Sequence, residues 1–366
     1  MKLVSPPTAE QQIHFLQQLR RILGEGSFTA SYKFALLHAL ADLCVLKGDD
    51  SGAELVLSSR EIAEQMIELY WRQTKPFPAS RGEPQVLQQN IGRKAKILSE
   101  IEAVQQEYGP SLQWVRQQPD AWERLVREVD RVVRVMPLWK LQTVGQERLD
   151  FLYENEDASD SVTLRLGVAY CFRAFYDLIT DLVRGSWLRY VRRYNAPVLG
   201  ETSDLSTFLF GSERASLAVY SPILLELQEG RCFYCRKNLR GGIEVDHFVP
   251  WAMYPVDLGH NFVLADGPCN RQKSDNLAAE PFLERWLVRN EEHRSLLIER
   301  FERAGAPHDA TASLRVAEWG YAQTARIGSQ VWGGGRSLVP LSTRWETLFR
   351  AHDPSIIAQH GAVILS

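Results

Sequence analysis

Four residues in the last third of the chain have side chains suited to hydrolytic chemistry. Asp246 and His247 are adjacent in the short run Ile243-Glu244-Val245-Asp246-His247, and Asn270 and Lys273 follow further along. A carboxylate and an amide oxygen are hard ligands of the kind that Mg²⁺ or Mn²⁺ prefers. A neutral imidazole can take a proton from water, and a lysine ammonium can hold a phosphate. Together these residue types favour metal-assisted hydrolysis of a phosphodiester bond.

Short predicted elements surround these residues. Residues 243–247 and 261–265 are predicted to form two strands, and the loop between them is rich in turn residues. The run Asp266-Gly267-Pro268 predicts the start of a helix. Two strands and a helix can bring Asp246, His247 and Asn270 to one point.

The segments CFYC, VDHFVP and HNFVLADGPCNRQKSDN occur in this order and resemble the HNH, or ββα-metal, endonuclease motif. The tail CNRQKSDN is also similar to the HNH domain of the CRISPR effector nucleases. The resemblance covers Arg231–Leu277, roughly an eighth of the chain. It implies a ββα-metal fold and one divalent ion held by the protein.

The resemblance also implies a role for each residue that matches the motif. Asp246 would be the first metal ligand and His247 the general base. Asn261 would be the central asparagine, which holds the loop by hydrogen bonds. Asn270 would be the second metal ligand, and Lys273 would contact phosphate.

The cysteines predict a second, structural metal site. Cys232-x-x-Cys235 is a knuckle that offers two corners of a tetrahedral zinc site. Many HNH proteins add a second CxxC before the helix, where this chain has Asp266-x-x-Cys269. Asp266 is therefore either the fourth zinc ligand or the helix N-cap. Without zinc, the three thiols would pack beneath the hairpin.

Composition limits the other function classes. The chain has 366 residues, 45% of them hydrophobic and 24% charged, which is typical of globular proteins. The net charge is 42 − 45 = −3, so a nucleic-acid surface must be a local patch. The expected contacts with the nucleic-acid backbone are Arg236, Lys237, Arg240, Arg271 and Lys273. No signal segment or long apolar run is present, which predicts a soluble, cytoplasmic protein.

Two groups of arginines lie outside the motif. Arg124, Arg127, Arg131 and Arg134 share one helix face, where nearby acids favour a salt-bridged surface over a phosphate-tracking one. Arg184, Arg189, Arg192 and Arg193 lie near a helix C-terminus, where cations are favoured in any case. His260 is interpreted as a structural residue.

The rest of the chain is predicted to be mainly helical. The expected helices span 8–23, 29–46, 58–72, 85–106, 121–136, 167–194, 214–228, 281–303 and 311–329, with a strand at 54–57 and short strands within 151–166. The fold class is thus mainly α with an embedded ββα-metal module, in a multi-domain α+β chain. The expected divisions are 1–78 (helical, with a winged-helix-like alternative), 79–212 (helical, regulatory or substrate-recognition), 213–303 (nuclease module) and 304–366 (helical).

These patterns predict an HNH endonuclease that hydrolyses phosphodiester bonds in DNA. A single module cuts one strand, so a double-strand break needs a homodimer or two successive events. Long HNH proteins with helical N-terminal regions resemble anti-phage defence effectors, some with partner proteins from multi-gene systems. Two alternatives stay open: a non-catalytic zinc-knuckle nucleic-acid-binding module, and an RNA- or tRNA-cleaving toxin.

Overall fold

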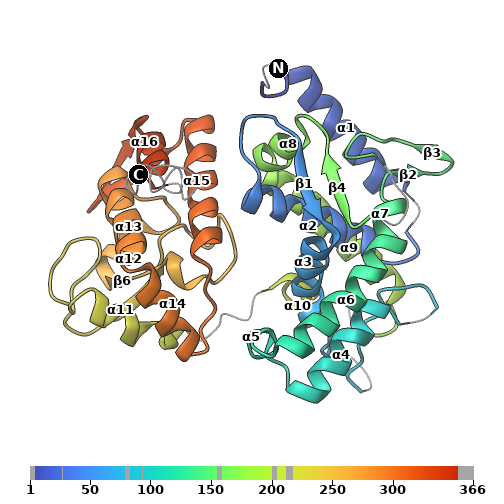
Figure 1. Cartoon of the computed structure of the whole chain (residues 1–366), viewed down its shortest axis with the longest axis horizontal. Coiled ribbons are helices and arrows are strands. Elements are labelled where there is room, and N and C mark those ends of the chain that lie inside the picture. The colour runs from blue at the N-terminus through green and yellow to red at the C-terminus, as the bar shows by residue number, and fades with distance from the viewer. Residues whose placement is uncertain are drawn as a thin grey trace, which may run out of the picture. The chain divides into compact units, whose positions relative to one another are not determined.

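The computed structural model describes residues 5–26, 28–78, 83–92, 94–154, 159–199, 204–211 and 217–352. The chain forms two compact units, Met1–Gly211 and Ser212–Ser366. Both units are mainly helical with small antiparallel sheets, as predicted (Figure 1). The unit boundary lies beside the start expected for the nuclease module at 213, while the further divisions at 78 and 303 stay predictions.

The first unit is assembled around α2 (Tyr32–Lys47), which is buried along most of its length. It packs against α3 (Ser59–Trp71), α8 (Val168–Ala174) and α9 (Tyr176–Tyr194) (Figure 1). The other described helices of this unit are α1 (Ala9–Glu25), α4 (Lys96–Tyr108), α5 (Leu112–Arg116), α6 (Pro119–Val135), α7 (Pro137–Lys140), α10 (Leu205–Phe210) and the 3₁₀ turn η1 (Arg72–Thr74). Strand β1 (Leu55–Ser58) pairs with β4 (Ser161–Leu164), and β2 (Thr143–Val144) pairs with β3 (Glu147–Arg148).

Local signals set several of the helix ends in this unit. Thr8 and Ser58 are followed three residues later by Gln11 and Glu61, a spacing that predicts capping boxes, and each caps its helix in this way. Gly48 ends α2. The predicted strand at 54–57 is confirmed with a shift of one residue, and its partner β4 lies within the predicted 151–166 region.

The helix predicted at 85–106 is wrong in its first half, because the chain becomes helical only at Lys96. Before that point the backbone forms isolated bridges between Phe77 and Gln85 and between Ala30 and Asn90. The buried Gln89 side chain accepts a hydrogen bond from the Trp187 indole at 2.9 Å and donates one to Gln73 at 2.6 Å. These tertiary contacts outweigh the helical pattern of the segment.

Two further predictions about helix ends are wrong. The helix expected at 121–136 begins earlier, at Pro119, so its N-cap is Gln118 and Asp120 lies in its first turn. The single helix expected at 167–194 is broken at Phe175, whose backbone leaves the helical region. The break allows Phe172 to pack against Phe15 while Tyr176 donates a hydrogen bond to Asp42 at 2.6 Å.

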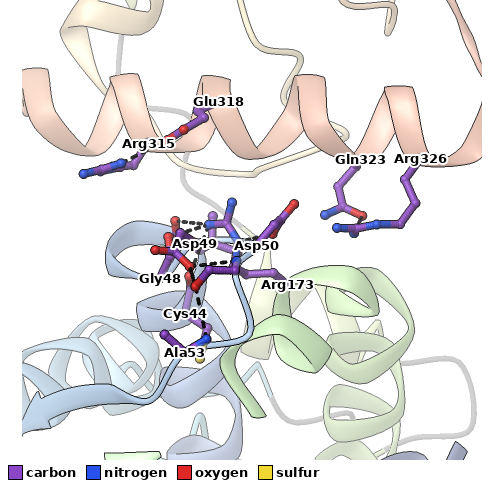
Figure 2. Close-up of polar contacts among 12 residues, drawn as sticks. Cys44, Gly48, Asp49, Asp50, Ala53, Arg173, Arg315, Glu318, Gln323 and Arg326 are labelled. Atoms are coloured by element: carbon purple, nitrogen blue, oxygen red, sulfur yellow. Dashed lines mark hydrogen bonds and ion pairs between the residues drawn. The ribbon is translucent and has the colours of Figure 1, made fainter. Parts of the chain in front are cut away.

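Arg173 closes the C-terminal end of α2. Its guanidinium donates to the carbonyl oxygens of Cys44, Val45 and Gly48 at 3.0–3.3 Å, and to the Asp50 carboxylate at 2.7 Å (Figure 2). A helix leaves its last carbonyls short of intrahelical partners, and here a buried arginine donates to them, although the Cys44 carbonyl also accepts the Gly48 backbone N–H at 3.0 Å.

The arginine row on α6 is the salt-bridged surface that the nearby acids favour. Arg124 pairs with Glu107, Arg131 with Glu128, and Arg134 with Asp130. In the second row, Arg184 donates to the ring of buried His38 at 2.9 Å.

The second unit contains the cysteines and the candidate hydrolytic residues. Its described elements are η2 (Leu217–Val219), α11 (Ser221–Leu227), β5 (Ile243–His247), η3 (Gly259–Asn261), β6 (Phe262–Asp266), α12 (Gly267–Lys273), α13 (Glu280–Glu292), α14 (Arg294–Arg303), α15 (Ala310–Ile327), β7 (Gln330–Gly334), β8 (Ser337–Pro340) and α16 (Arg344–Ala351). A core of Tyr220, Leu224, Phe262, Leu264, Leu297, Phe301 and Ala306 lies under the β5–β6 hairpin.

Three expectations for this unit need correction. The helix predicted at 281–303 is two helices that meet at His293. The helix expected at 214–228 is described as η2 and α11, and its first residues lie outside the described part of the chain. The β7–β8 hairpin lies within 304–366, which was expected to be a helical segment and for which no strand was predicted.

The sequence has no apolar run long enough to predict a membrane-spanning helix. Among the residues described, no helix combines the length and the apolar character needed to cross a bilayer.

Candidate metal centre and hydrolytic site

A hairpin followed at once by a helix positions the candidate residues. Strands β5 and β6 are antiparallel, with Asp246 opposite Val263 and His247 opposite Phe262. Helix α12 begins directly after β6, with Asp266 as its N-cap. The order of two strands and a helix is the one predicted from the sequence.

Four side chains of this unit form a group that can hold a metal ion. The Sγ atoms of Cys232, Cys235 and Cys269 and a carboxylate oxygen of Asp266 all lie within 4.8 Å of one another. The spacing suits a tetrahedral ion, whose bonds to sulfur and oxygen are about 2.0–2.3 Å long. Arg236 adopts a left-handed conformation with φ 63°, which turns the chain back after the second cysteine.

Asp266 is the N-cap of α12, and its second carboxylate oxygen lies among the cysteine thiols. Its Oδ1 accepts the backbone N–H of Cys269 at 2.7 Å as the helix cap, and its Oδ2 accepts from the Cys235 thiol at 3.1 Å. Burial raises the pKa of this carboxyl, but the hydrogen bonds from Cys269 and Cys235 outweigh burial, and the pKa lies below its usual value. A ligand that stays ionised suits a cation.

Asp246 is buried and has two donors on its carboxylate. The Tyr234 hydroxyl donates to Oδ2 at 2.5 Å, and the Lys273 ammonium lies 3.2 Å from the same oxygen. Burial and then the Asp246 carboxylate raise the pKa of Tyr234 well above its usual value, so this hydroxyl keeps its proton.

Lys273 differs most from its expected position. A phosphate contact requires an exposed ammonium, whereas the Lys273 side chain is fully buried. Its Nζ also donates to the carbonyl oxygen of His247 at 2.8 Å. In this structure Lys273 is the counter-ion of Asp246 and does not reach the surface.

Asn270 meets a carboxylate that the sequence reasoning missed. Its Nδ2 donates to Glu244 Oε2 at 2.6 Å. Glu244 lies two residues before Asp246, so both carboxylates project from the same face of β5. The alternation of residues 243–247 is the sequence signal for Glu244, whereas the family motif includes only Asp246.

His247 forms a pair with a second residue that was not predicted. Its Nε2 lies 2.8 Å from Asp257 Oδ1, and the side chains are 15% and 11% exposed. Trp251 and Phe262 meet the imidazole edge-on, with ring centroids 5.2 Å and 4.7 Å away.

Asn261 fastens the loop that follows β5. Its Oδ1 accepts from Val249 N at 2.8 Å, and its Nδ2 donates to Val249 O at 3.0 Å. These are loop-holding hydrogen bonds of the kind that the resemblance implies for this position. The neighbouring His260 is fully buried, and burial followed by Arg289 lowers its pKa to about 3.

The basic residues expected to contact nucleic acid are on the surface, apart from Lys273. Arg236, Lys237 and Arg240 are exposed around the cysteine knuckle. Arg271 is also exposed, and its guanidinium lies 3.8 Å from Glu244. Arg236, Lys237 and Arg240 lie in the segment just before β5, and Arg271 lies on α12 beside Asn270.

The comparisons with known proteins find a match only within the first unit, Met1–Gly211. Residues 12–206 match a family described as Domain of unknown function (DUF8808). No curated protein and no solved structure matches the chain. The match ends before the cysteine knuckle begins, so it gives no information about the candidate site.

Proposed function

The chain belongs to the DUF8808 family, and we propose that it is a metal-dependent HNH (ββα-metal) endonuclease that hydrolyses phosphodiester bonds in DNA. One observation carries the proposal. Two residues of α12, Asn270 and Lys273, contact the carboxylates of Glu244 and Asp246 on one face of β5. His247 is the next residue of β5, so the proposed metal ligands and the proposed base come from one strand.

The oxygen donors fit a hard divalent cation such as Mg²⁺ or Mn²⁺. Glu244 and Asp246 carry carboxylates on one strand face, and Asn270, whose Nδ2 donates to Glu244, also has an amide oxygen that could serve as a ligand. When bound, such an ion supplies positive charge beside the scissile phosphate. Lys273 holds the Asp246 carboxylate in place from the protein interior.

His247 is the proposed general base. Its Nε2 is occupied by Asp257, which leaves Nδ1 to take a proton from the attacking water. The hydroxide forms a bond to phosphorus, the phosphorus–oxygen bond of the leaving group breaks, and the leaving oxygen takes a proton from solvent. Asn261 keeps the loop after β5 fixed during this step.

The three thiols and Asp266 are proposed to hold a structural Zn²⁺. Thiolate sulfur is the ligand that zinc favours, and a carboxylate oxygen is an accepted fourth ligand. This ion would be distinct from the catalytic one, because Asp266 and Cys269 lie at the start of α12 and Asn270 and Lys273 follow them.

DNA is the proposed substrate. The first unit, Met1–Gly211, is proposed to recognise a substrate or partner and to restrain the nuclease. The arginines and lysine around the knuckle are the proposed backbone contacts. A role in defence against foreign DNA follows only by analogy with other long HNH proteins.

A second function is favoured by the same contacts. Because Tyr234 and Lys273 already occupy the Asp246 carboxylate, a non-catalytic module that binds nucleic acid through its knuckle is the strongest rival. An RNA-cleaving activity is the third candidate, since the proposed chemistry does not use the 2′-hydroxyl.

A plasmid-nicking assay in Mg²⁺ separates these candidates. The full-length wild type should relax supercoiled DNA, and His247→Ala should lower the rate by about 10²–10⁴-fold, as the loss of a general base does. His14→Ala, at an exposed histidine of α1, is the matched control and should cut like the wild type.

The other outcomes of this assay decide between the candidates. Equal cleavage by His247→Ala and the wild type would show that His247 is not the general base. Binding of DNA without cleavage by any variant supports the binding module. Cleavage of a labelled RNA in preference to DNA supports the third candidate.

A further inference from the structure

We propose that Asp257 is a positioning residue for His247, holding the imidazole as the tautomer that has its proton on Nε2 and a bare Nδ1. The inference rests on the proposed function for its catalytic meaning, whereas the pairing of the two side chains is a property of the folded protein.

The contact itself determines the tautomer. Nε2 lies 2.8 Å from Asp257 Oδ1, a hydrogen-bonding distance. An ionised carboxylate only accepts hydrogen bonds, so Nε2 must carry the hydrogen. In a neutral ring the acceptor is then Nδ1. Both side chains are largely shielded from water, which makes their hydrogen bond stronger than an exposed one.

The rest of the unit fixes the position of Asp257. Two residues later, the Gly259 backbone N–H donates to the Pro307 carbonyl at 2.9 Å. A Cβ at Gly259 would lie 2.7 Å from the Phe301 ring, so the chain is pressed against the core at this point. The loop that ends at Asp257 is held at its other end by the two hydrogen bonds between Asn261 and Val249.

The imidazole is held as firmly as its partner. Trp251 and Phe262 pack against it edge-on. The ring therefore cannot rotate freely to exchange its nitrogens. With both partners fixed, Asp257 selects which nitrogen faces the water that is to be activated, and so acts on the reaction through His247.

The test measures the tautomer and the reaction separately. In the full chain, ¹⁵N-labelled histidine spectra should show His247 with its hydrogen on Nε2, with the signal assigned from its loss in His247→Gln. Asp257→Asn can donate an amide N–H to Nε2 and should shift the ring toward the Nδ1–H form. Nicking by this variant should fall by about 100-fold or more in kcat with little change in KM.

Two variants control for a merely structural effect. Asp257→Glu keeps a carboxylate, and should keep the wild-type tautomer and at least a tenth of the nicking rate. Asp181→Asn removes an exposed carboxylate on α9 and should change neither readout. A melting temperature within a few degrees of the wild type shows that each variant is folded.

Two results would overturn the inference: a wild-type His247 with its hydrogen on Nδ1, or an Asp257→Asn variant that nicks at the wild-type rate. If the wild type nicks nothing, the proposed function fails. The ring tautomer then decides alone whether Asp257 controls His247.

Discussion

Acid should destabilise the second unit through His260. This residue lies in η3 and is fully buried, and in the described part of the chain neither ring nitrogen has a hydrogen-bond partner. Burial, and then the nearby Arg289 guanidinium, lower its pKa from 6.5 to about 3. The folded protein therefore keeps this ring neutral at pH values where the unfolded chain protonates it.

The size of the effect follows from the two pKa values. Above pH 6.5 neither state binds the proton and the full stability is present. Below pH 6.5 the unfolded state gains protons that the folded state does not, and stability falls by about 1.4 kcal/mol per pH unit until pH 3 is approached. Between pH 7 and pH 5 the loss from this group is about 2 kcal/mol.

His260→Leu isolates this contribution, because leucine has a similar volume and does not titrate. Urea unfolding of both proteins at pH 7 and pH 5 should show the free-energy difference between them widening by about 2 kcal/mol in favour of the leucine variant. His14→Leu, at an exposed histidine, should show no such widening. Parallel pH dependences for the wild type and His260→Leu would refute the assignment of a neutral, buried ring.

Two further predictions concern the metal group and the end of α2. Plasma mass spectrometry should find about one zinc per chain. Cys235→Ser should lower the zinc content, whereas Cys171→Ser should preserve it. Chelation should lower the free energy of unfolding by about 2.7 kcal/mol if the free zinc concentration was about 100 times the Kd. Arg173→Met should cost roughly 3–5 kcal/mol in urea unfolding, because the buried carbonyls of Val45 and Gly48 lose this donor and Asp50 loses its ion-pair partner; a loss below about 1 kcal/mol would contradict that role.

Local signals predicted the elements whose ends depend on neighbouring residues. The capping boxes at Thr8 and Ser58 and the N-cap at Asp266 are short-range hydrogen bonds, so a few residues suffice to identify them. The strands of the hairpin were also found to within a residue. The order of the elements in the candidate site was therefore readable from the sequence.

Long-range contacts account for what the sequence reasoning missed. Residues 85–95 have a helical pattern, but the side chain of Gln89 bonds to Gln73 and to Trp187, a residue far along the chain. The break at Phe175 likewise serves packing against α1 and α2. Periodicity contains no information about such partners.

The same limit applies within the candidate site. Asp257 lies in a turn-rich loop, and its pairing with His247 depends on where the loop folds back. The burial of Lys273 depends on the length of α12 and on Tyr234 from the knuckle, which approaches Asp246 from another segment. The motif names the residues, whereas the fold decides which of them meet.

Asp266 links the two candidate metal sites through one helix. Its Oδ1 holds the first turn of α12 and its Oδ2 faces the cysteine thiols, so an ion bound by the thiols also fixes the helix start. Asn270 and Lys273 extend from that same helix to Glu244 and Asp246. Loss of the structural ion should therefore disturb the oxygen donors even though it removes none of them.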